Sequence, residues 1–368
     1  MKNQVYKTIF AGSIICISLC SASLKTLNAI NNINHGYYDS ISESYISIAN
    51  NYIKTGDYRK ALEATEKLHL YRKSELPDTS SAIIQSYINM ALVNMNIYEY
   101  ERALRYLREA EIICLRTGRN ESEQIGSLYT QMGRIYKENG DFNRAAQYFK
   151  RVDQLIDNHH LKNKKRLISY YLISADLKLI SGNTAESLEL YEKYYNVIKT
   201  VENNNALLVN YYKGSAIALA KAGKFNESID LFYKAADIAA RDTSGNLVEL
   251  AVLYNNIGFA HLGLNQLSQA EVSLNKSLGI FRKVNAKGSH LIELYENFGR
   301  YYFLKGNYIK ALQEYQEGLQ YSTSATNLDN VLENPGIDEI MALVPTLQLL
   351  KLKSNCLKEL YLKNKKTN

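Results

Sequence analysis

The side chains that most often carry catalysis or bind metals are few in this sequence. Its 368 residues include four cysteines and six histidines. Cys16 and Cys20 lie in an apolar stretch near the N-terminus, whereas Cys114 and Cys356 lie on separate predicted helices. Two isolated cysteines make no disulfide framework, and a lone helical cysteine is usually a small buried residue. We therefore interpret Cys114 and Cys356 as core residues.

The histidines and carboxylates form no catalytic pattern either. His159 and His160 are adjacent in a predicted exposed loop, and neighbouring residues do not converge on one metal without further ligands. His261 occupies a helix position that tyrosine fills elsewhere in the chain, so we expect it to be packed. The sequence has no P-loop, HExxH, CxxC or GxSxG motif, and its carboxylates are scattered. We expect no metal, no cofactor and no enzyme activity.

Amide and guanidinium side chains remain as the groups that could bind a ligand. They can form hydrogen bonds with the main chain or the acidic side chains of an extended peptide. Seven of them lie on predicted helices, close to a small residue: Asn89, Gln131, Arg134, Asn255, Asn256, Asn297 and Arg300. We predict that Asn256, Asn297 and Arg300 form one ligand patch. The alternative is that these are solvated polar positions.

A predicted pair of helices positions these residues, and the segment Leu291–Tyr321 is its clearest example. Apolar residues recur at helical spacing in the first half of this segment and again in the second half. Gly306 and Asn307 separate the halves, and both residue types tolerate the left-handed conformation that ends a helix. Gly299 and Ala311 are small, which predicts that the two antiparallel helices cross closely.

The pair recurs seven times. The small residues of the first helices are Ala49, Ala91, Gly133, Ala175, Ala216, Gly258 and Gly299, at spacings of 41 or 42 residues. The second helices repeat these spacings with Ala61, Ala103, Ala145, Ser187, Ser228, Ala270 and Ala311. A glycine marks the turn in five repeats, whereas the second and sixth have Tyr98 and Asn265 at that point. A fixed period at two positions predicts a repeat architecture.

These patterns resemble the tetratricopeptide repeat (TPR) family. The likeness is carried by a small residue three positions before an aromatic on first helices, as in Gly299 and Tyr302. On second helices a small residue precedes an aromatic by four positions, as in Ala311 and Tyr315. The longer period is similar to that of kinesin-light-chain repeats. The resemblance implies an all-α fold: a right-handed superhelical solenoid of about seven helix-turn-helix repeats and a C-terminal helix.

The resemblance also implies a function. In this family the first helices line a concave groove, and residues 254–258 and 296–299 are similar to the asparagine-containing first helix of peptide-binding members. It therefore implies a non-catalytic scaffold or adaptor that binds a protein or an extended peptide.

The expected organisation has five parts: a signal peptide, a lead-in, the repeats, a linker with a short helix, and an amphipathic capping helix with a Lys-rich tail. Their bounds are 1–23, 24–40, 41–323, 324–346 and 347–368. Lys2 and Lys7 precede an apolar run that is short for a membrane span, and small residues follow it, as in a secretory signal with cleavage between 22 and 29. We expect a periplasmic or secreted protein. An uncleaved anchor, a lipoprotein or a cytoplasmic protein stays open.

The charge distribution argues against nucleic acid as a partner. The formal net charge is +7, but residues 1–29 contribute +3 and residues 351–368 contribute +5, so the remainder carries −1. A nucleic-acid-binding protein needs a concentrated basic face, which the repeats lack. We expect membrane contact only through an uncleaved signal.

The C-terminal part allows two interpretations. Leu362-Lys363-Asn364 mirrors Leu304-Lys305-Gly306 at the end of the seventh first helix, so an eighth second helix would begin where the chain stops. The last helix either caps the stack, or the chain is the repeat half of a truncated or split protein. For the second interpretation, residues 332–361 resemble the passage before the CHAT protease domain of bacterial TPR proteins. No catalytic residue can be carried over from that family.

Overall fold

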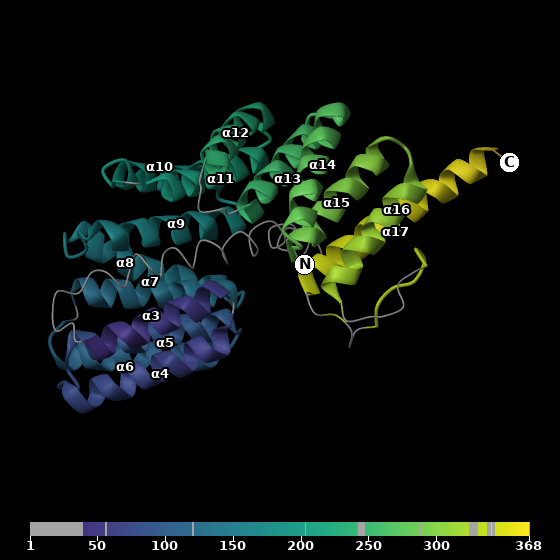
Figure 1. Ribbon diagram of the computed structural model, residues 1–368. Coiled ribbons are helices and arrows are strands. Elements are labelled where there is room, and N and C mark those ends of the chain that lie inside the picture. The colour runs from purple at the N-terminus through teal and green to yellow at the C-terminus, as the bar shows by residue number, and fades with distance from the viewer. Residues whose placement is uncertain are drawn as a thin grey trace. The chain divides into compact units, whose positions relative to one another are not determined.

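The computed structural model describes residues 40–367, apart from 56, 120, 203, 242–246, 287–288, 324–329, 337–339 and 341–342. The predicted signal sequence and nearly all of the lead-in lie outside the described residues. Within the described ranges the chain forms fifteen α-helices and no β-strand, which confirms the all-α class (Figure 1). None of the described helices is long and apolar enough to span a membrane.

The helices alternate as first and second members of seven hairpins, followed by one more helix. The first helices are α3 (Ser40–Thr55), α5 (Ser81–Asn96), α7 (Glu123–Glu138), α9 (Lys164–Ile180), α11 (Asn205–Lys221), α13 (Leu247–Gly263) and α15 (Ser289–Leu304). The second helices are α4 (Tyr58–Glu75), α6 (Tyr100–Arg116), α8 (Phe142–Asp157), α10 (Thr184–Ile198), α12 (Phe225–Arg241), α14 (Leu267–Lys283) and α16 (Tyr308–Ser322). The last helix is α17 (Leu343–Thr367).

The helices group into two compact units. The N-terminal unit comprises α3–α8 and α9 as far as Leu177, together with residues 196–198, and the C-terminal unit comprises 178–195 and 199–367 of the described chain. In each unit a first helix packs on its own second helix and that second helix packs on the next first helix, as α13, α14 and α15 do (Figure 1). One hairpin alone leaves an apolar face uncovered, so neighbouring hairpins complete each other's core.

The small residues lie at the predicted crossings. All seven small residues of the second helices are fully buried, with 0% exposure. A Cβ placed on Gly133 would lie 2.3 Å from Cε1 of Phe149, and one on Gly299 would lie 2.2 Å from Cε1 of Tyr315. Both aromatic rings belong to the second helix of the same hairpin. The register inferred from the sequence is confirmed.

The turn between the two helices of a hairpin needs a left-handed residue. Gly140, Gly182, Gly223 and Gly306 have φ between 71° and 83°. The two repeats without glycine keep the same geometry, since Tyr98 has φ 64° and Asn265 has φ 56°. The turn conformation is therefore imposed by the hairpin and does not depend on glycine being present.

In three of the hairpins a helix cap and a cation–aromatic contact also join the two helices. In the third repeat Asp141 caps α8 by accepting a hydrogen bond from the Arg144 backbone N–H (3.0 Å), and the Arg144 guanidinium lies 5.1 Å from the centre of the Tyr136 ring. The same three positions are Tyr52, Asp57 and Lys60 in the first repeat and Tyr302, Asn307 and Lys310 in the seventh. The cap satisfies a free N–H at the start of the second helix, and the cation packs over the aromatic ring.

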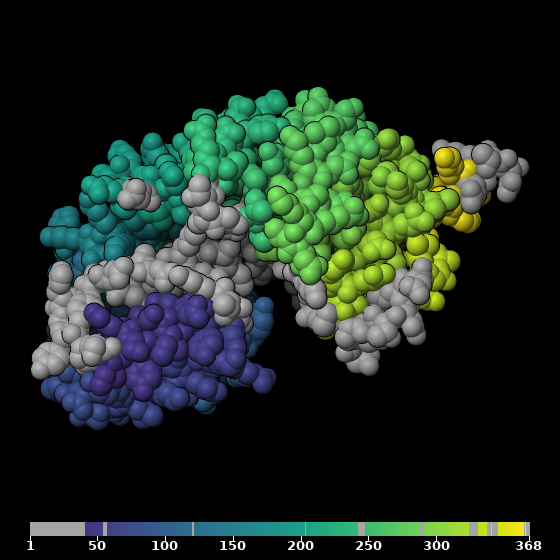
Figure 2. Space-filling model, viewed as in Figure 1, coloured from purple at the N-terminus to yellow at the C-terminus, as the bar shows by residue number. Residues whose placement is uncertain are grey.

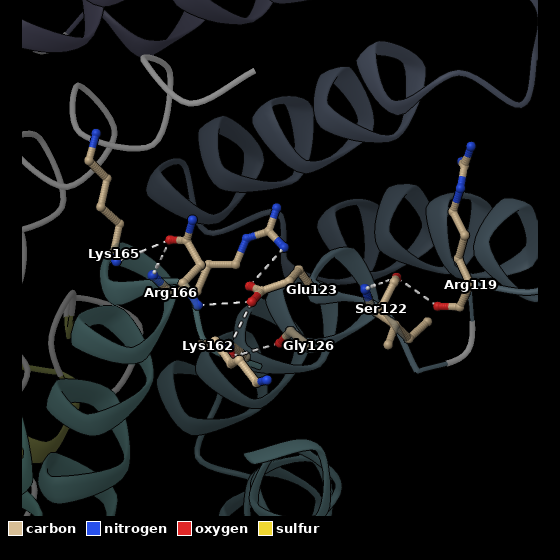
Figure 3. A network of polar contacts seen from close by, with 10 residues as sticks. Arg119, Ser122, Glu123, Gly126, Lys162, Lys165 and Arg166 are labelled. Carbon is tan, nitrogen blue, oxygen red and sulfur yellow. Dashed lines mark hydrogen bonds and ion pairs between the residues drawn. The ribbon is translucent and has the colours of Figure 1, made fainter. Parts of the chain in front are cut away.

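A carboxylate joins the third and fourth repeats. Oε1 of Glu123, at the start of α7, accepts hydrogen bonds from the backbone N–H groups of Lys162 (2.7 Å) and Asn163 (2.8 Å). Its Oε2 lies 3.4 Å from Nη1 of Arg166 on α9 (Figure 3). Glu123 therefore fixes the loop that leads into the next repeat.

The C-terminal helix differs from the expectation in its end point. It continues through Leu362-Lys363-Asn364 to Thr367, whereas α15 ends at Leu304, so the proposed mirror is wrong. The physical reason is that Gly306 adopts φ 71° to begin a turn, whereas Asn364 remains helical. Most of the predicted short helix in the linker lies outside the described residues.

Candidate protein-binding face

In both units, first helices contact the first helix of a neighbouring hairpin. In the N-terminal unit α5 contacts α7, and in the C-terminal unit α11 contacts α13 and α13 contacts α15. No two successive second helices in the described parts of either unit have contacts of comparable extent. We call the first-helix side of each unit its inner side, because the hairpins lie closest together there.

The three predicted site residues of the N-terminal unit are buried on α5 and α7. The side-chain oxygen of Asn89 lies 3.0 Å from Nε2 of Gln85, one turn earlier. Gln131 is 2% exposed, and its Oε1 has no hydrogen-bond partner. Arg134 is also buried. An unsatisfied buried amide oxygen is costly, so Gln131 is the member of this group that most clearly calls for a donor.

In the C-terminal unit two of the predicted residues are hydrogen-bonded to each other. Nδ2 of Asn297 donates a hydrogen bond to Oδ1 of Asn255 across α15 and α13 (2.9 Å). Asn256 is also buried. Arg300 forms an ion pair with Glu296 on its own helix, with Nη2 2.7 Å from Oε1. The amide pair thus links neighbouring repeats, and a role of these residues in binding stays a prediction.

Sequence reasoning missed a row of charged residues on the same side. Nζ of Lys213 on α11 lies 2.8 Å from Oε1 of Glu249 on α13, and both side chains are buried. His290 and Glu293 on α15 come close enough to this pair to interact electrostatically with Lys213. With Glu296 and Arg300, these residues make up what we call the charged row: Lys213, Glu249, His290, Glu293, Glu296 and Arg300.

Two members of the charged row lack a hydrogen-bond partner at a shielded atom, namely Oε1 of Glu293 and Nδ1 of His290. Burial raises the pKa of the Glu293 carboxyl well above its usual range; the Glu296 carboxylate raises it further, and Lys213 opposes the shift. Burial lowers the pKa of His290, with Glu249 opposing and Lys213 reinforcing the shift. The row therefore holds a carboxyl group that a cationic donor would stabilise.

The repeat register contains a signal for part of this row. Glu249 and His290 each lie nine residues before the small residue of their helix, Gly258 and Gly299 respectively, so an alignment of repeats places them side by side. Lys213 lies three residues before Ala216, so it does not occupy the equivalent position in its repeat. Its meeting with Glu249 depends on the stagger between α11 and α13, which the period alone does not give.

The reactive residues considered from the sequence do not form a site in the described parts of the chain. Cys114 and Cys356 are buried free thiols, and burial raises the pKa of each to about 11. His261 is packed, with Nδ1 2.7 Å from Oε1 of Gln266. His160 is partly exposed and lies 3.6 Å from Glu121. Among the described residues no three His, Cys, Asp or Glu side chains are grouped as metal ligands.

Family models named tetratricopeptide repeat match residues 126–159 and 207–283. The chain contains tetratricopeptide repeats. No curated protein has a sequence significantly similar to this one. The CHAT resemblance of residues 332–361 stays a prediction.

Solved structures with a similar arrangement of helices include a TPR protein and two Rap proteins. A TPR protein from Parabacteroides merdae is 14% identical, with 86% of this chain and 100% of that chain covered and a TM-score of 0.51. The apo form of RapI is 14% identical over 79% of this chain and 78% of that chain, with a TM-score of 0.59. A Rap protein complexed with competence and sporulation factor is 13% identical over 77% of each chain, with a TM-score of 0.56. At these identities the likeness shows the fold alone.

Proposed function

We propose that this TPR chain is an exported, non-catalytic scaffold that binds a protein or an extended peptide along the inner side of its first helices. The repeats and the fold shared with a Rap protein that was solved with competence and sporulation factor support a protein-binding role. The observation that carries the proposal is the shielded Glu293 oxygen without a hydrogen-bond partner, in a row of charged residues on that side.

The charged row also specifies the chemistry of the partner. Lys213 pairs with Glu249 and Arg300 pairs with Glu296, and neither cation forms a close ion pair with Glu293. A lysine or arginine side chain, or the amino terminus of a peptide, would pair with this carboxylate. Such pairing lowers the carboxyl pKa, so binding would release a proton at any pH where the free protein keeps this carboxyl protonated.

Affinity capture with crosslinking tests this role. The mature chain, starting at about residue 24 as the signal sequence predicts, would capture its partner from a periplasmic extract, followed by mass spectrometry. The isosteric variant Glu293→Gln should lose most of the captured protein. Combined alanine substitution of Asn256, Asn297 and Arg300 tests the predicted patch in the same assay.

The control for this assay is Val272→Ala, because Val272 is 56% exposed on α14, a second helix. This variant should capture the partner as the unmodified chain does. Equal capture by Glu293→Gln, with circular dichroism showing both proteins folded, would rule out the charged row as the binding site.

Export is a separate part of the proposal and rests on residues 1–23. N-terminal sequencing of the protein from a periplasmic fraction should find a first residue between 22 and 29. Recovery of the chain from the cytoplasm with Met1 retained would contradict export and leave the binding proposal intact.

A further inference from the structure

The last helix, α17, packs as a first helix of an eighth repeat would. Its buried stripe is Thr346, Leu349, Lys353 and Cys356, each at most 2% exposed. In α15 the buried stripe Leu291, Leu294, Phe298 and Tyr301 has the same spacings of three, four and three residues. α17 packs on α16 as α15 packs on α14, so the two buried stripes can be aligned, with Thr346 at the position of Leu291. In this alignment Ser354 of α17 corresponds to Gly299 of α15.

This correspondence identifies the face of α17 that would hold a second helix. In α15 that face is Ile292, Tyr295, Gly299 and Tyr302, and α16 covers it: Ile292 is 2% exposed and packs with Ala311 and Tyr315. The equivalent residues of α17 are Leu347, Leu350, Ser354 and Leu357.

These residues keep the chemistry of a helix-binding face. Leu347, Ser354 and Leu357 are exposed, whereas Leu350 is partly buried and packs against the core beside α16. Leu347 is 42% exposed, Leu357 is 39% exposed and Tyr361, one turn further, is 66% exposed. Ser354 supplies the small residue at the crossing point and is exposed. Figure 2 shows part of α17 (yellow) at the edge of the C-terminal unit, beside α16. Exposed apolar residues in one stripe are typical of an interaction surface.

The lysines beside the exposed apolar stripe indicate which kind of helix could bind there. Lys351, Lys358 and Lys365 are exposed and recur every seven residues, so they follow the stripe along one edge. Residues 343–367 contain six lysines and one acidic residue, Glu359. A second copy of α17 would bring lysines against lysines, whereas an acidic helix would pair with them.

We propose that the exposed face of α17 binds an acidic amphipathic helix of a partner protein, which packs on α17 as α16 packs on α15. The face is separate from the charged row of the inner side, so the two sites can be tested independently. Leucine and tyrosine side chains provide the apolar contacts, Ser354 permits the close crossing, and the lysines fix the orientation and the charge of the bound helix.

A labelled peptide with the α16 sequence tests the proposal. It spans residues 308–322 and carries Lys310→Glu, so that its only charged side chains are carboxylates. Fluorescence anisotropy with the full chain should show saturable binding that weakens at high salt. The double variants Leu347→Asp/Leu357→Asp and Lys351→Glu/Lys358→Glu should each weaken binding at least about tenfold, because each removes one half of the recognition.

The matched control is Val272→Asp, because Val272 is an apolar residue on α14 that is more exposed than Leu347 and Leu357. It should leave the affinity unchanged. The proposal is overturned if the peptide does not bind, if the α17 variants bind it as well as the control does, or if a form with lysine at every carboxylate position binds equally well. A dimer that dissociates on the Leu347→Asp/Leu357→Asp change would also overturn it, by showing that a second copy is the occupant.

Discussion

Single small residues decide how closely the paired helices approach each other. A Cβ on Gly299 would enter the ring of Tyr315, which is itself 1% exposed and has little room to move. Gly299→Ala should therefore lower the free energy of unfolding by about 1–3 kcal/mol through overpacking. Gly133→Leu and Ala145→Leu should have the same kind of effect at the third hairpin. Urea unfolding followed by circular dichroism measures these changes.

Gly279 is the matched control for this prediction. It lies in α14, is exposed, and has no atom within 4 Å of an added Cβ. Gly279→Ala should stabilise the protein by up to about 1 kcal/mol, because alanine has the higher helix propensity. Opposite signs for the two glycine variants support the crossing geometry, and equal changes would contradict it.

Tyr98 is the residue least suited to its backbone conformation. It adopts φ 64° where most other described repeats have glycine, and its side chain is 75% exposed. Tyr98→Gly should raise the free energy of unfolding by roughly 0.5–1 kcal/mol, because glycine relieves the left-handed strain. Asn265→Gly should gain less, because asparagine tolerates this conformation better. A destabilised Tyr98→Gly protein would refute this account.

Glu293 gives the stability a defined pH dependence. Its pKa in the folded protein is raised above the unfolded value, so the folded state retains its proton to higher pH. The contribution to stability is thus complete below the unfolded pKa of about 4.3 and is lost as pH rises through the folded pKa.

The variant Glu293→Gln should remove this loss. Its free energy of unfolding in urea should match that of the parent near pH 4 and exceed it at pH 8. Glu317→Gln, at an exposed position of α16, should change little at either pH. Parallel pH profiles for the parent and Glu293→Gln would contradict the raised pKa.

At the scale of elements, Glu123 holds the start of α7 to the loop before α9 and to Arg166, and so joins the third and fourth repeats. Glu123→Ala removes two charge-assisted hydrogen bonds to backbone N–H groups and an ion pair with Arg166, and should cost about 1–3 kcal/mol. Glu121→Ala is the control, because Glu121 is largely exposed and its ion pair with His160 is long, at 3.6 Å. This change should cost less than about 0.5 kcal/mol. Thermal unfolding of both variants measures the difference.

The sequence was sufficient to predict the hairpins because their register depends on residue size. Gly299 and Ala311 mark where two helices cross, and a period of 41 or 42 residues repeats that mark. The predicted end of α17 was wrong because it came from aligning Leu362-Lys363 with Leu304-Lys305 by composition. The buried residues of the two helices instead align Cys356 with Tyr301. Composition alone does not distinguish two registers that differ by one helical turn.

At the scale of the whole molecule, the candidate face was predicted in outline and not in its pairings. The seven amide and guanidinium residues lie on first helices as expected, and Asn297 donates a hydrogen bond to Asn255, a pairing that the sequence analysis did not predict. Pairings such as Lys213 with Glu249 depend on the stagger between successive hairpins. A sequence period specifies which residues occupy equivalent positions in successive repeats. It does not specify which side chains of neighbouring helices contact each other.

Photo-crosslinking in the source cells tests most directly whether the first helices form the binding face. A photoreactive amino acid would replace Arg300 on α15 in one variant and Val272 on α14 in another. The account predicts a crosslinked protein partner from position 300 and none from position 272. Crosslinks from position 272 alone, or from neither position, would contradict it.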